Sequence, residues 1–408
     1  MSRFRSYSLF LGRLAPGILF GALLVVGPLS AADRKVEIHG FLTQAWGTTD
    51  FVDGPLSALA GSPTEAERLL GLEEGGTFDY RNLALQFRYA ITDRDIMLLQ
   101  LSHEATGISP VDDERDEIEL DWGFYERRIG HNTSVKVGRI PIPYGIYNEI
   151  RDVGTILPFF RPPYSNYLEG AFTSETVDGV TLAQNFAVES PWSLDLDLYI
   201  GQFETFEFSP ITFGALAVTS DVVGIQLWLN TPLDGLRFGY SYQDREEEGG
   251  FFRLPDQPTD SESWMASVEA AFHRWSFRTE YRIFEPFIPA GLLGPVRVDL
   301  ELLSWYAQLG WRISDLIQLY AQVELQGVEQ ENPLVVNGPV DFDNRDDFGV
   351  AINISFSSQV VLKAEYHWVE QEGPQFTPVL TPQGPGLRAD ILSADGGNYA
   401  ILALSTSF

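Results

Sequence analysis

Apolar and polar residues alternate one by one over most of this chain, and this period of two constrains the fold more than any other feature of the sequence. Apolar residues take the odd positions in 317–325 and the even positions in 359–369, and segments 80–89, 117–127 and 194–200 alternate in the same way. A period of two belongs to β-strands that present two different faces. Because water-soluble sandwiches alternate as well, the connections between segments must decide the architecture.

The connections alternate strictly between short and long. Sixteen strand segments are predicted near residues 36–46, 78–89, 94–104, 116–128, 133–139, 177–187, 191–201, 217–229, 235–244, 262–273, 274–285, 300–312, 315–327, 345–356, 359–369 and 397–408. Seven short links lie at 90–93, 130–132, 187–190, 230–234, 273–274, 313–314 and 357–358. Eight long links cover 47–77, 105–115, 140–176, 202–216, 245–261, 286–299, 328–344 and 370–396. Short turns on one side and long loops on the other are typical of outer-membrane barrels, and lipid forbids open sheet edges. The predicted fold is therefore all-β, a transmembrane up-and-down antiparallel β-barrel of about 16 strands.

The two faces of these segments suit a lipid exterior and a wet lumen. Aromatic residues near segment ends on the apolar face, among them Trp275, Trp311 and Trp368, fit the girdles of such barrels, although strand propensity alone also favours aromatic residues. On the alternate face, Glu324 and Lys363 would be costly to bury in a dry core. A water-filled interior is the simpler interpretation.

The first 32 residues have the features of a signal peptide. Three arginines precede an apolar run that ends in a Ser-Ala-Ala pattern, with cleavage expected after Ala32. Two prolines interrupt the run, which argues against the alternative of a membrane-anchoring helix. We therefore expect residues 1–32 to be removed and residues 33–408 to form a single barrel domain. Loss of the three arginines takes the formal net charge from −30 to −33.

Composition excludes several classes of function. The 57 acidic against 27 basic side chains argue against nucleic acid as a partner, and 13% aromatic residues argue against an acidic disordered chain. The absence of cysteine excludes disulfides, Cys-ligated metals and Cys nucleophiles. The five histidines show no metal-ligand spacing, and no local catalytic or cofactor-binding motif is present. No enzyme activity, cofactor or metal site is therefore predicted, with a lumen enzyme built from distant strands as a minor alternative.

Local segments of the chain resemble Gram-negative porins. These segments are Val137–Gly145 (VGRIPIPYG), Glu37–Phe41 (EIHGF) and the last segment, whose terminal Phe408 is similar to the C-terminal assembly signal of bacterial outer-membrane proteins. The resemblance covers essentially all of the mature chain and is to the phosphate-selective-type and related substrate-specific porins. It implies homotrimers with one pore per subunit, a third loop folded into the lumen and location in a Gram-negative outer membrane. It also implies outer-membrane lipid, lipopolysaccharide, periplasmic chaperones and the barrel-assembly machinery as partners.

The third long link, 140–176, is the longest and is the main candidate for a functional loop. Five prolines and six of its seven aromatic residues favour an ordered structure, and its charges have both signs. We expect it to fold inward and narrow the pore, because opposed charges across a narrow lumen set ion selectivity. Packing against neighbouring loops or a trimer partner is the alternative. The candidate constriction or solute-binding residues are Arg88, Lys136, Arg139, Tyr144, Glu149, Arg151, Asp152, Arg161, Arg278 and Arg282.

Alternation alone assigns further charges to the lumen wall, where each is more simply interpreted as a solvated or paired charge. The basic ones are Arg127, Arg237 and Lys363, and the acidic ones are Glu104, Glu117, Glu119, Asp121, Asp195, Asp197, Glu269, Glu280, Glu324 and Glu365. Because the acidic members are so numerous, phosphate selectivity is not expected to carry over from the resemblance.

Two further features belong to the other long links. The spacing in Ser62-Pro63-Thr64-Glu65 is that of a capping box and predicts a short helix. Acidic clusters at 112–114, 246–248 and 341–347 predict an acidic rim, bridged to lipid phosphates by divalent cations. A calcium loop in the last cluster would need a glycine at its sixth position and a distal glutamate, which it lacks.

These observations predict a passive diffusion channel for small hydrophilic solutes or ions. A structural or surface-binding barrel whose lumen is closed by the third loop is the alternative function. If the third loop forms the constriction, replacement of Arg151 and Arg161 should shift the ion preference of the channel toward cations.

Overall fold

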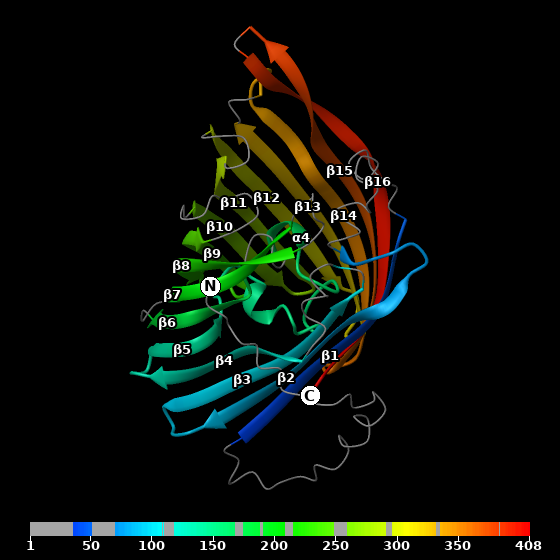
Figure 1. Ribbon diagram of the computed structural model, residues 1–408. Coiled ribbons are helices and arrows are strands. Elements are labelled where there is room, and N and C mark those ends of the chain that lie inside the picture. The colour runs from blue at the N-terminus through cyan, green and yellow to red at the C-terminus, as the bar shows by residue number, and fades with distance from the viewer. Residues whose placement is uncertain are drawn as a thin grey trace, which may run out of the picture.

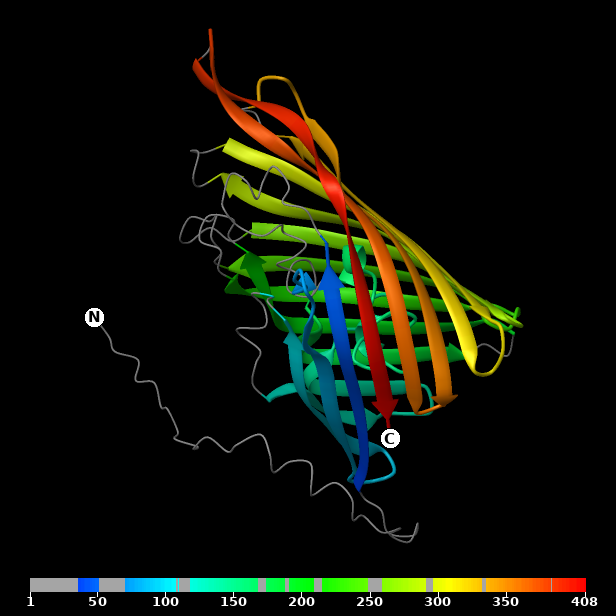
Figure 2. The same ribbon diagram turned by 90° about the vertical axis from the view of Figure 1, so that its right-hand side faces the viewer.

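The strands of this protein follow one another around a closed antiparallel barrel (Figures 1 and 2). The computed structural model describes residues 36–50, 70–107, 109, 118–167, 174–187, 191–208, 215–248, 259–290, 296–331, 335–382 and 384–408. Within them, the strands are β1 (Val36–Thr49), β2 (Thr77–Ala90), β3 (Asp95–Thr106), β4 (Glu119–Arg128), β5 (Thr133–Pro141), β6 (Thr176–Ala187), β7 (Ser193–Phe208), β8 (Ala215–Asn230), β9 (Leu236–Glu248), β10 (Thr259–Phe272), β11 (Trp275–Ala290), β12 (Val296–Arg312), β13 (Ile317–Glu331), β14 (Val340–Ser357), β15 (Val360–Thr381) and β16 (Gly384–Ser407). Each strand pairs with its sequence neighbours, so the prediction of a 16-stranded up-and-down barrel is confirmed.

The barrel closes between its first and last strands. β1 pairs with β16 in antiparallel register from Phe41–Ser407 to Thr49–Tyr399. Two backbone hydrogen bonds of 3.1 and 3.0 Å between Gly40 and Phe408 complete the seam. Figure 2 shows the two strands side by side, with the carboxyl terminus at the end of the barrel where the short turns lie. No sheet edge is left open along this seam, as a lipid-exposed sheet requires.

Burial follows the alternation of the sequence. On β15, Lys363 and Glu365 point inward and are buried, whereas Tyr366 and Trp368 point outward and are exposed. Aromatic residues also gather on the outer face at the ends of strands, where the rings of Trp275 and Trp311 stack with centroids 5.6 Å apart. The polar interior and apolar exterior are those of a membrane barrel.

Several strands run further than the sequence pattern indicated. The largest difference concerns the long link predicted at 370–396, which instead continues β15 and β16 as a paired hairpin. This hairpin projects beyond the rest of the barrel wall at the end where the loops lie (Figures 1 and 2). Beyond Gln371, β15 no longer pairs with β14, so Pro374 and Pro378 lie on an edge strand, where a missing N–H is tolerated.

Three of the other sequence predictions concern residues that the structure does not describe, and a fourth is wrong. The signal peptide at 1–32 and the helix from Ser62 lie outside the described residues, as does the acidic cluster at 112–114. The assignment of Asp347 to an exposed acidic rim is wrong, because this carboxylate is buried in β14 and bonds to Arg345 and His367. Among the described residues, no helix has both the length and the apolar character needed to cross a membrane.

Candidate functional site: a loop across the lumen

The link between β5 and β6 folds into the barrel. We call residues 142–175 loop L3; the structure describes 142–167 and 174–175. L3 contains a short 3₁₀ helix, η2 (Asn148–Ile150), and one helical turn, α4 (Tyr164–Tyr167). Figure 1 shows α4 inside the ring of strands, and all four of its residues are buried. The described part of L3 therefore runs inside the ring of strands.

Glu280 on β11 is the most heavily bonded anchor of L3. Its carboxylate accepts hydrogen bonds from the Ile146 amide at 2.9 Å, the Ser267 hydroxyl at 2.6 Å and the Tyr306 hydroxyl at 2.7 Å, and also from the Tyr167 hydroxyl. Ile146 begins the loop's inward course and Tyr167 lies in α4. One buried carboxylate thus joins two distant parts of L3 to the wall.

The first part of L3 is bonded to three further strands. The Tyr144 hydroxyl lies 2.7 Å from the Ser263 hydroxyl of β10, and the Gly145 amide donates to the Ser241 hydroxyl of β9 at 3.1 Å. The Gly145 carbonyl accepts from the Gln226 amide of β8 at 2.9 Å. Each backbone group of Gly145 is therefore held by a side chain on the wall, which fixes the path of the loop.

The helical turn α4 is bound through its backbone by two more wall residues. The carboxylate of Glu324 on β13 accepts from the Ser165 amide at 2.8 Å, and the Arg282 guanidinium on β11 donates to the Asn166 carbonyl at 3.2 Å. Burial raises the pKa of the Tyr147 and Tyr167 hydroxyls above the usual tyrosine range, so both remain protonated. Tyr167 can therefore keep donating to Glu280.

The segment from Leu157 to Phe160 is bound by β15. The Lys363 ammonium donates to the Leu157 carbonyl at 2.6 Å and to the Phe159 carbonyl at 2.9 Å, and the Glu365 carboxylate accepts from the Phe160 amide at 2.7 Å. Lys363 is 1% exposed. These two charged side chains are therefore used to hold the loop rather than to face solutes.

The middle of L3 contacts β2 and β3 and comes close to the β1–β16 seam. Asp152 accepts from Gln100 of β3 at 2.7 Å and from Asn82 of β2 at 3.3 Å. A Cβ atom added to Gly154 would come within 3.3 Å of the Cβ of Ser405 on β16. Only glycine permits the loop to approach the β1–β16 seam this closely. L3 therefore spans the lumen and touches opposite sides of it.

Apolar packing covers the side of L3 that faces β4 to β8. The cluster joins loop residues, such as Ile142 and Leu157, to inward-facing side chains of the wall. The wall members include Trp122 and Phe124, whose rings stack at 5.7 Å, and Trp228. Because these side chains are buried against one another, L3 and the wall leave no water-filled space between them along this side of the lumen.

Charged side chains that keep contact with solvent gather on the turn side of L3. We call Lys136, Glu149, Arg237, Glu269 and Arg278 the vestibule group; their side chains are 20% to 48% exposed. Glu269 pairs with Arg237 at 2.6 Å and with Arg278 at 2.8 Å. Lys136 lies 4.0 Å from Glu149 of the loop. These charges can act on a solute through a confined, partly wet space.

A chain of hydrogen bonds continues from the vestibule group along the wall. Arg278 donates to the Tyr147 hydroxyl at 3.3 Å, and this hydroxyl donates to the side-chain amide oxygen Oε1 of Gln308. The Gln308 amide bonds to Gln322, which in turn bonds to Glu324. This series of hydrogen bonds connects the partly exposed vestibule group to Glu324, a buried residue that holds L3.

Three acidic residues lie together where L3 meets β4. Asp121, Asp152 and Glu175 have carboxylate oxygens within 4.8 Å of one another. Protein groups supply donors to this cluster: the Gln100 amide bonds to both aspartates, and the Arg151 guanidinium lies 3.9 Å from Glu175. Arg151 also donates to the Tyr167 carbonyl at 3.0 Å.

The structure distributes the ten predicted constriction residues among three places. Five belong to L3, four face the lumen from strands, and one is on the outer surface. The loop residues are Tyr144, Glu149, Arg151, Asp152 and Arg161; the strand residues facing the lumen are Arg88, Lys136, Arg278 and Arg282. Arg88 is remote from L3 and pairs at 2.9 Å with Glu37. Arg278 and Arg282, the predicted basic residues of β11, both contact the loop.

Two arginines that the sequence placed in the lumen face the outside of the barrel instead. Arg139 pairs with Asp178 at 3.3 Å on the outer face, and Arg127 pairs with Asp95 at 3.0 Å on the same face. On β5 the inward positions are even-numbered, as Lys136 and the buried Ile140 show. Arg139 is an odd-numbered residue of the same strand and must face outward. The assignments of Arg139 and Arg127 to the lumen were wrong.

The site also contains residues that the sequence did not single out. Ser241, Ser263 and Asn353 are small polar side chains at inward positions that bond to L3, with Asn353 donating to the Pro158 carbonyl at 3.0 Å. Their signal is a polar residue at an inward position of a strand. That signal recurs in every strand of a wet barrel, so it does not distinguish loop anchors from solvated wall residues.

Comparison with known proteins gives a structural likeness at low sequence identity. No family model matches the sequence, and no curated protein matches it. OmpT of Vibrio cholerae, in a trimer form, aligns over 91% of this chain and 99% of its own with a TM-score of 0.54 and 12% identity. An anion-selective porin from Comamonas acidovorans aligns over 91% and 99% with a TM-score of 0.51 and 10% identity. The outer-membrane channel DcaP of Acinetobacter baumannii aligns over 94% and 100% with a TM-score of 0.52 and 11% identity. The chain therefore has a porin-like 16-stranded barrel fold.

Proposed function

We propose that this protein is an outer-membrane channel that lets small hydrophilic solutes or ions diffuse passively. The observation that carries the proposal is loop L3, which crosses the lumen of a closed barrel and leaves a group of partly exposed charges on its turn side. A narrow passage beside mixed charges selects solutes by size and by local field. The likeness to solved porins and channels supports this function.

We further propose that the channel is of the substrate-specific kind to which the phosphate-selective-type porins belong. The support is the way L3 is braced on several sides by polar contacts and apolar packing, which favours a small and rigid opening. We do not propose that the channel selects phosphate. The vestibule group contains Glu149 and Glu269 beside its three basic residues, and both would repel a phosphate.

The location and partners follow from the same proposal. The exposed apolar outer face fits outer-membrane lipid and lipopolysaccharide. Export through the signal peptide, and insertion by periplasmic chaperones and the barrel-assembly machinery, would bring the chain there. A homotrimer is proposed because OmpT, which shares the fold, is known in a trimer form.

The proposal is tested by recording currents from the purified protein in a planar bilayer. We expect discrete conductance steps and a reversal potential in a salt gradient that changes when vestibule charges are removed. The matched control is Arg139→Gln, which removes a positive charge from the outer face and should leave both quantities unchanged. Absence of conductance steps would contradict the channel function.

A closed barrel with a structural or surface-binding role is the second candidate function. The observation that favours it is the density of packing around L3, which is bonded to strands on opposite sides and covered by a buried apolar cluster. In that case the wild-type protein would show no conductance, and a variant that releases L3 would conduct. The same bilayer recordings therefore separate the two candidates.

A further inference from the structure

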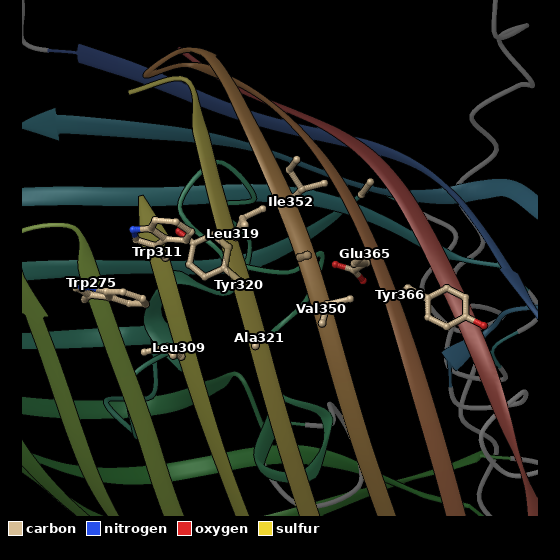
Figure 3. Close-up of a pocket in the computed structure, with 12 residues that line it drawn as sticks. Trp275, Leu309, Trp311, Leu319, Tyr320, Ala321, Val350, Ile352, Glu365 and Tyr366 are labelled. Atoms are coloured by element: carbon tan, nitrogen blue, oxygen red, sulfur yellow. The ribbon is translucent and has the colours of Figure 1, made fainter. Parts of the chain in front are cut away.

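Hollows on the two faces of the barrel wall differ in their lining. On the outer face, a groove over β11 to β15 has a largely apolar lining, which Figure 3 shows from Trp275 to Tyr366. On the lumen face, a polar cavity of about 260 Å³ lies where the β4–β5 turn meets β6 and β7. We call it the turn-side cavity. It adjoins Lys136 and Glu149 of the vestibule group, so a solute in the lumen can reach it.

The register of the strands places the floor of the turn-side cavity on the lumen side. Ser134 of β5 pairs with Ala183 of β6, which pairs with Asp197 of β7. Asp197 also pairs with Gln226 of β8, whose side-chain amide bonds to L3. Residues directly opposite each other in a sheet share a face, so all four face the lumen. Because Ser134 and Ala183 are small, they leave a hollow beside Asp197.

Two carboxylates of β7 line this hollow and differ in their partners. Asp195 accepts hydrogen bonds from the side-chain amides of Asn185 and Asn230, the second at 2.8 Å. Asp197 is half-buried, and no group among the described residues donates a hydrogen bond to its carboxylate or forms an ion pair with it. Its oxygens are therefore available to a donor that enters the cavity.

The charges around the cavity add up to a negative total. Glu126 lies 3.9 Å from Arg128 on the wall opposite β7, and Lys136 lies 4.0 Å from Glu149 of L3, so each of these pairs is close to neutral. The two aspartates of β7 have no positive partner within the described part of the chain. The cavity therefore attracts a cation.

We propose that the turn-side cavity binds the primary ammonium group of a small organic cation, and that such cations are solutes of the channel. The inference rests on the proposed channel function for the passage of the solute, whereas the binding does not depend on conduction. An ammonium group has three N–H donors, and its hydrogen bonds to the carboxylates of Asp197 and Asp195 are of the strong, charge-assisted kind. The volume is several times the roughly 30 Å³ that a water molecule occupies, so an organic ion fits.

The lining favours a primary over a quaternary ammonium group. Quaternary ammonium groups are typically bound in cages of aromatic rings, and the described lining contains no Phe, Tyr or Trp side chain. It offers carboxylate, amide and hydroxyl oxygens instead, which accept hydrogen bonds that a quaternary ammonium group cannot donate. Ethanolammonium and choline are therefore suitable probes, because they have the same charge and the same hydroxyl end and only the first has N–H donors.

Binding is tested by ligand-detected NMR on the purified full chain in detergent, with ethanolammonium and choline at equal concentrations and pH 7. We expect the bound fraction of ethanolammonium to exceed that of choline several-fold. Asp197→Asn keeps the shape of the side chain, removes its charge and should abolish the difference. Asp221→Asn removes the same charge at an exposed outward position of β8 and should preserve it. Equal binding of the two probes by the wild type, or an unchanged difference in Asp197→Asn, would overturn the proposal.

Passage is tested in a planar bilayer by the permeability ratio of ethanolammonium to choline. Because choline is also the larger ion, the change of this ratio between variants is decisive. Ala183→Leu fills the cavity and should lower the ratio several-fold, whereas Ala271→Leu, at an inward position of β10 outside the cavity, should not. Equal ratios in the two variants would contradict the proposal.

The outcomes separate this inference from the channel function. Conductance steps in potassium chloride, with a permeability ratio that Asp197→Asn leaves unchanged, would overturn the inference and leave the channel function standing. Absence of steps, with ethanolammonium still bound in the NMR experiment, would contradict the channel function and the passage of the cation but support the binding site.

Discussion

The two sides of the lumen hold loop L3 by different means. On β11 to β15, buried charged groups such as Glu280, Glu324 and Lys363 bond directly to the loop. Toward β4 to β8 the contact is mainly apolar. The charges of the vestibule group, which come from β5, from L3 and from β9 to β11, stay partly in solvent. Position in the lumen therefore decides the role of a charge. One set fixes the loop, and the other remains free to act on solutes.

The largest effect on conductance and stability is expected from a variant that removes a buried anchor of L3. Glu280→Ala removes the acceptor of four hydrogen bonds and leaves buried donors on Ile146, Ser267 and Tyr306 without it. We expect the docking of L3 to weaken by about 3 kcal/mol, with a several-fold rise in single-channel conductance and a lower unfolding temperature. Glu262→Ala, on the exposed face of β10, is the control and should change neither. If Glu280→Ala conducts and unfolds like the wild type, the carboxylate does not hold the loop.

A smaller effect of a different kind is expected on the vestibule side. Arg237→Gln with Arg278→Gln leaves Glu269 without its two ion pairs. A single charge at about 4 Å is worth about 1 kcal/mol even in water, so we expect the permeability ratio to shift several-fold toward cations, read from the reversal potential. Arg127→Gln with Arg139→Gln makes the same change in charge on the outer face. Equal shifts in the two double variants would mean that overall charge, not the vestibule group, sets selectivity.

The smallest effect on selectivity is expected for Arg161, which the sequence placed in the constriction. Its guanidinium donates to the Tyr80 hydroxyl and lies 5.3 and 5.7 Å from the ring centroids of Tyr80 and Phe160. Burial lowers the pKa of the guanidinium, and the group remains charged. Arg161→Gln should cost about 1–2 kcal/mol of stability and shift the reversal potential less than the vestibule variant does. A shift as large as that of the vestibule variant would place Arg161 on the ion path.

How far the sequence predicts this molecule depends on the range of the interactions involved. Alternation is a local property, so it was sufficient for the strands, the closed barrel and the inward faces of Lys136 and Arg278. The same rule excludes Arg139, which differs from Lys136 by an odd number of positions; the porin-like segment around it led to the wrong assignment. The sequence indicates that L3 folds inward, through its prolines and aromatic residues.

The contacts of the loop could not be predicted in this way. Glu280, Glu324 and Glu365 were all expected on the lumen wall, yet alternation cannot distinguish an anchor that bonds to L3 from a charge in water. That distinction depends on which backbone groups of the loop reach each strand, a matter of tertiary structure. The extension of β15 and β16 was missed for a related reason, because Pro374 and Pro378 favour a loop unless the strand lies at an edge.

The central claim is that L3 crosses the lumen to the β1–β16 seam, and the natural absence of cysteine allows a direct test. A Cβ on Gly154 would lie 3.3 Å from that of Ser405, close to the range of about 3.5–4.5 Å found in disulfides. Gly154→Cys with Ser405→Cys, in a Thr43→Ala background that makes room for the new side chain, should form a disulfide in the folded barrel. Gly154→Cys with Leu404→Cys should not, because Leu404 faces outward. Quantitative cross-linking of the first pair alone, measured by intact mass, is the predicted result; no cross-link in the first pair, or equal cross-linking in both, would contradict the account.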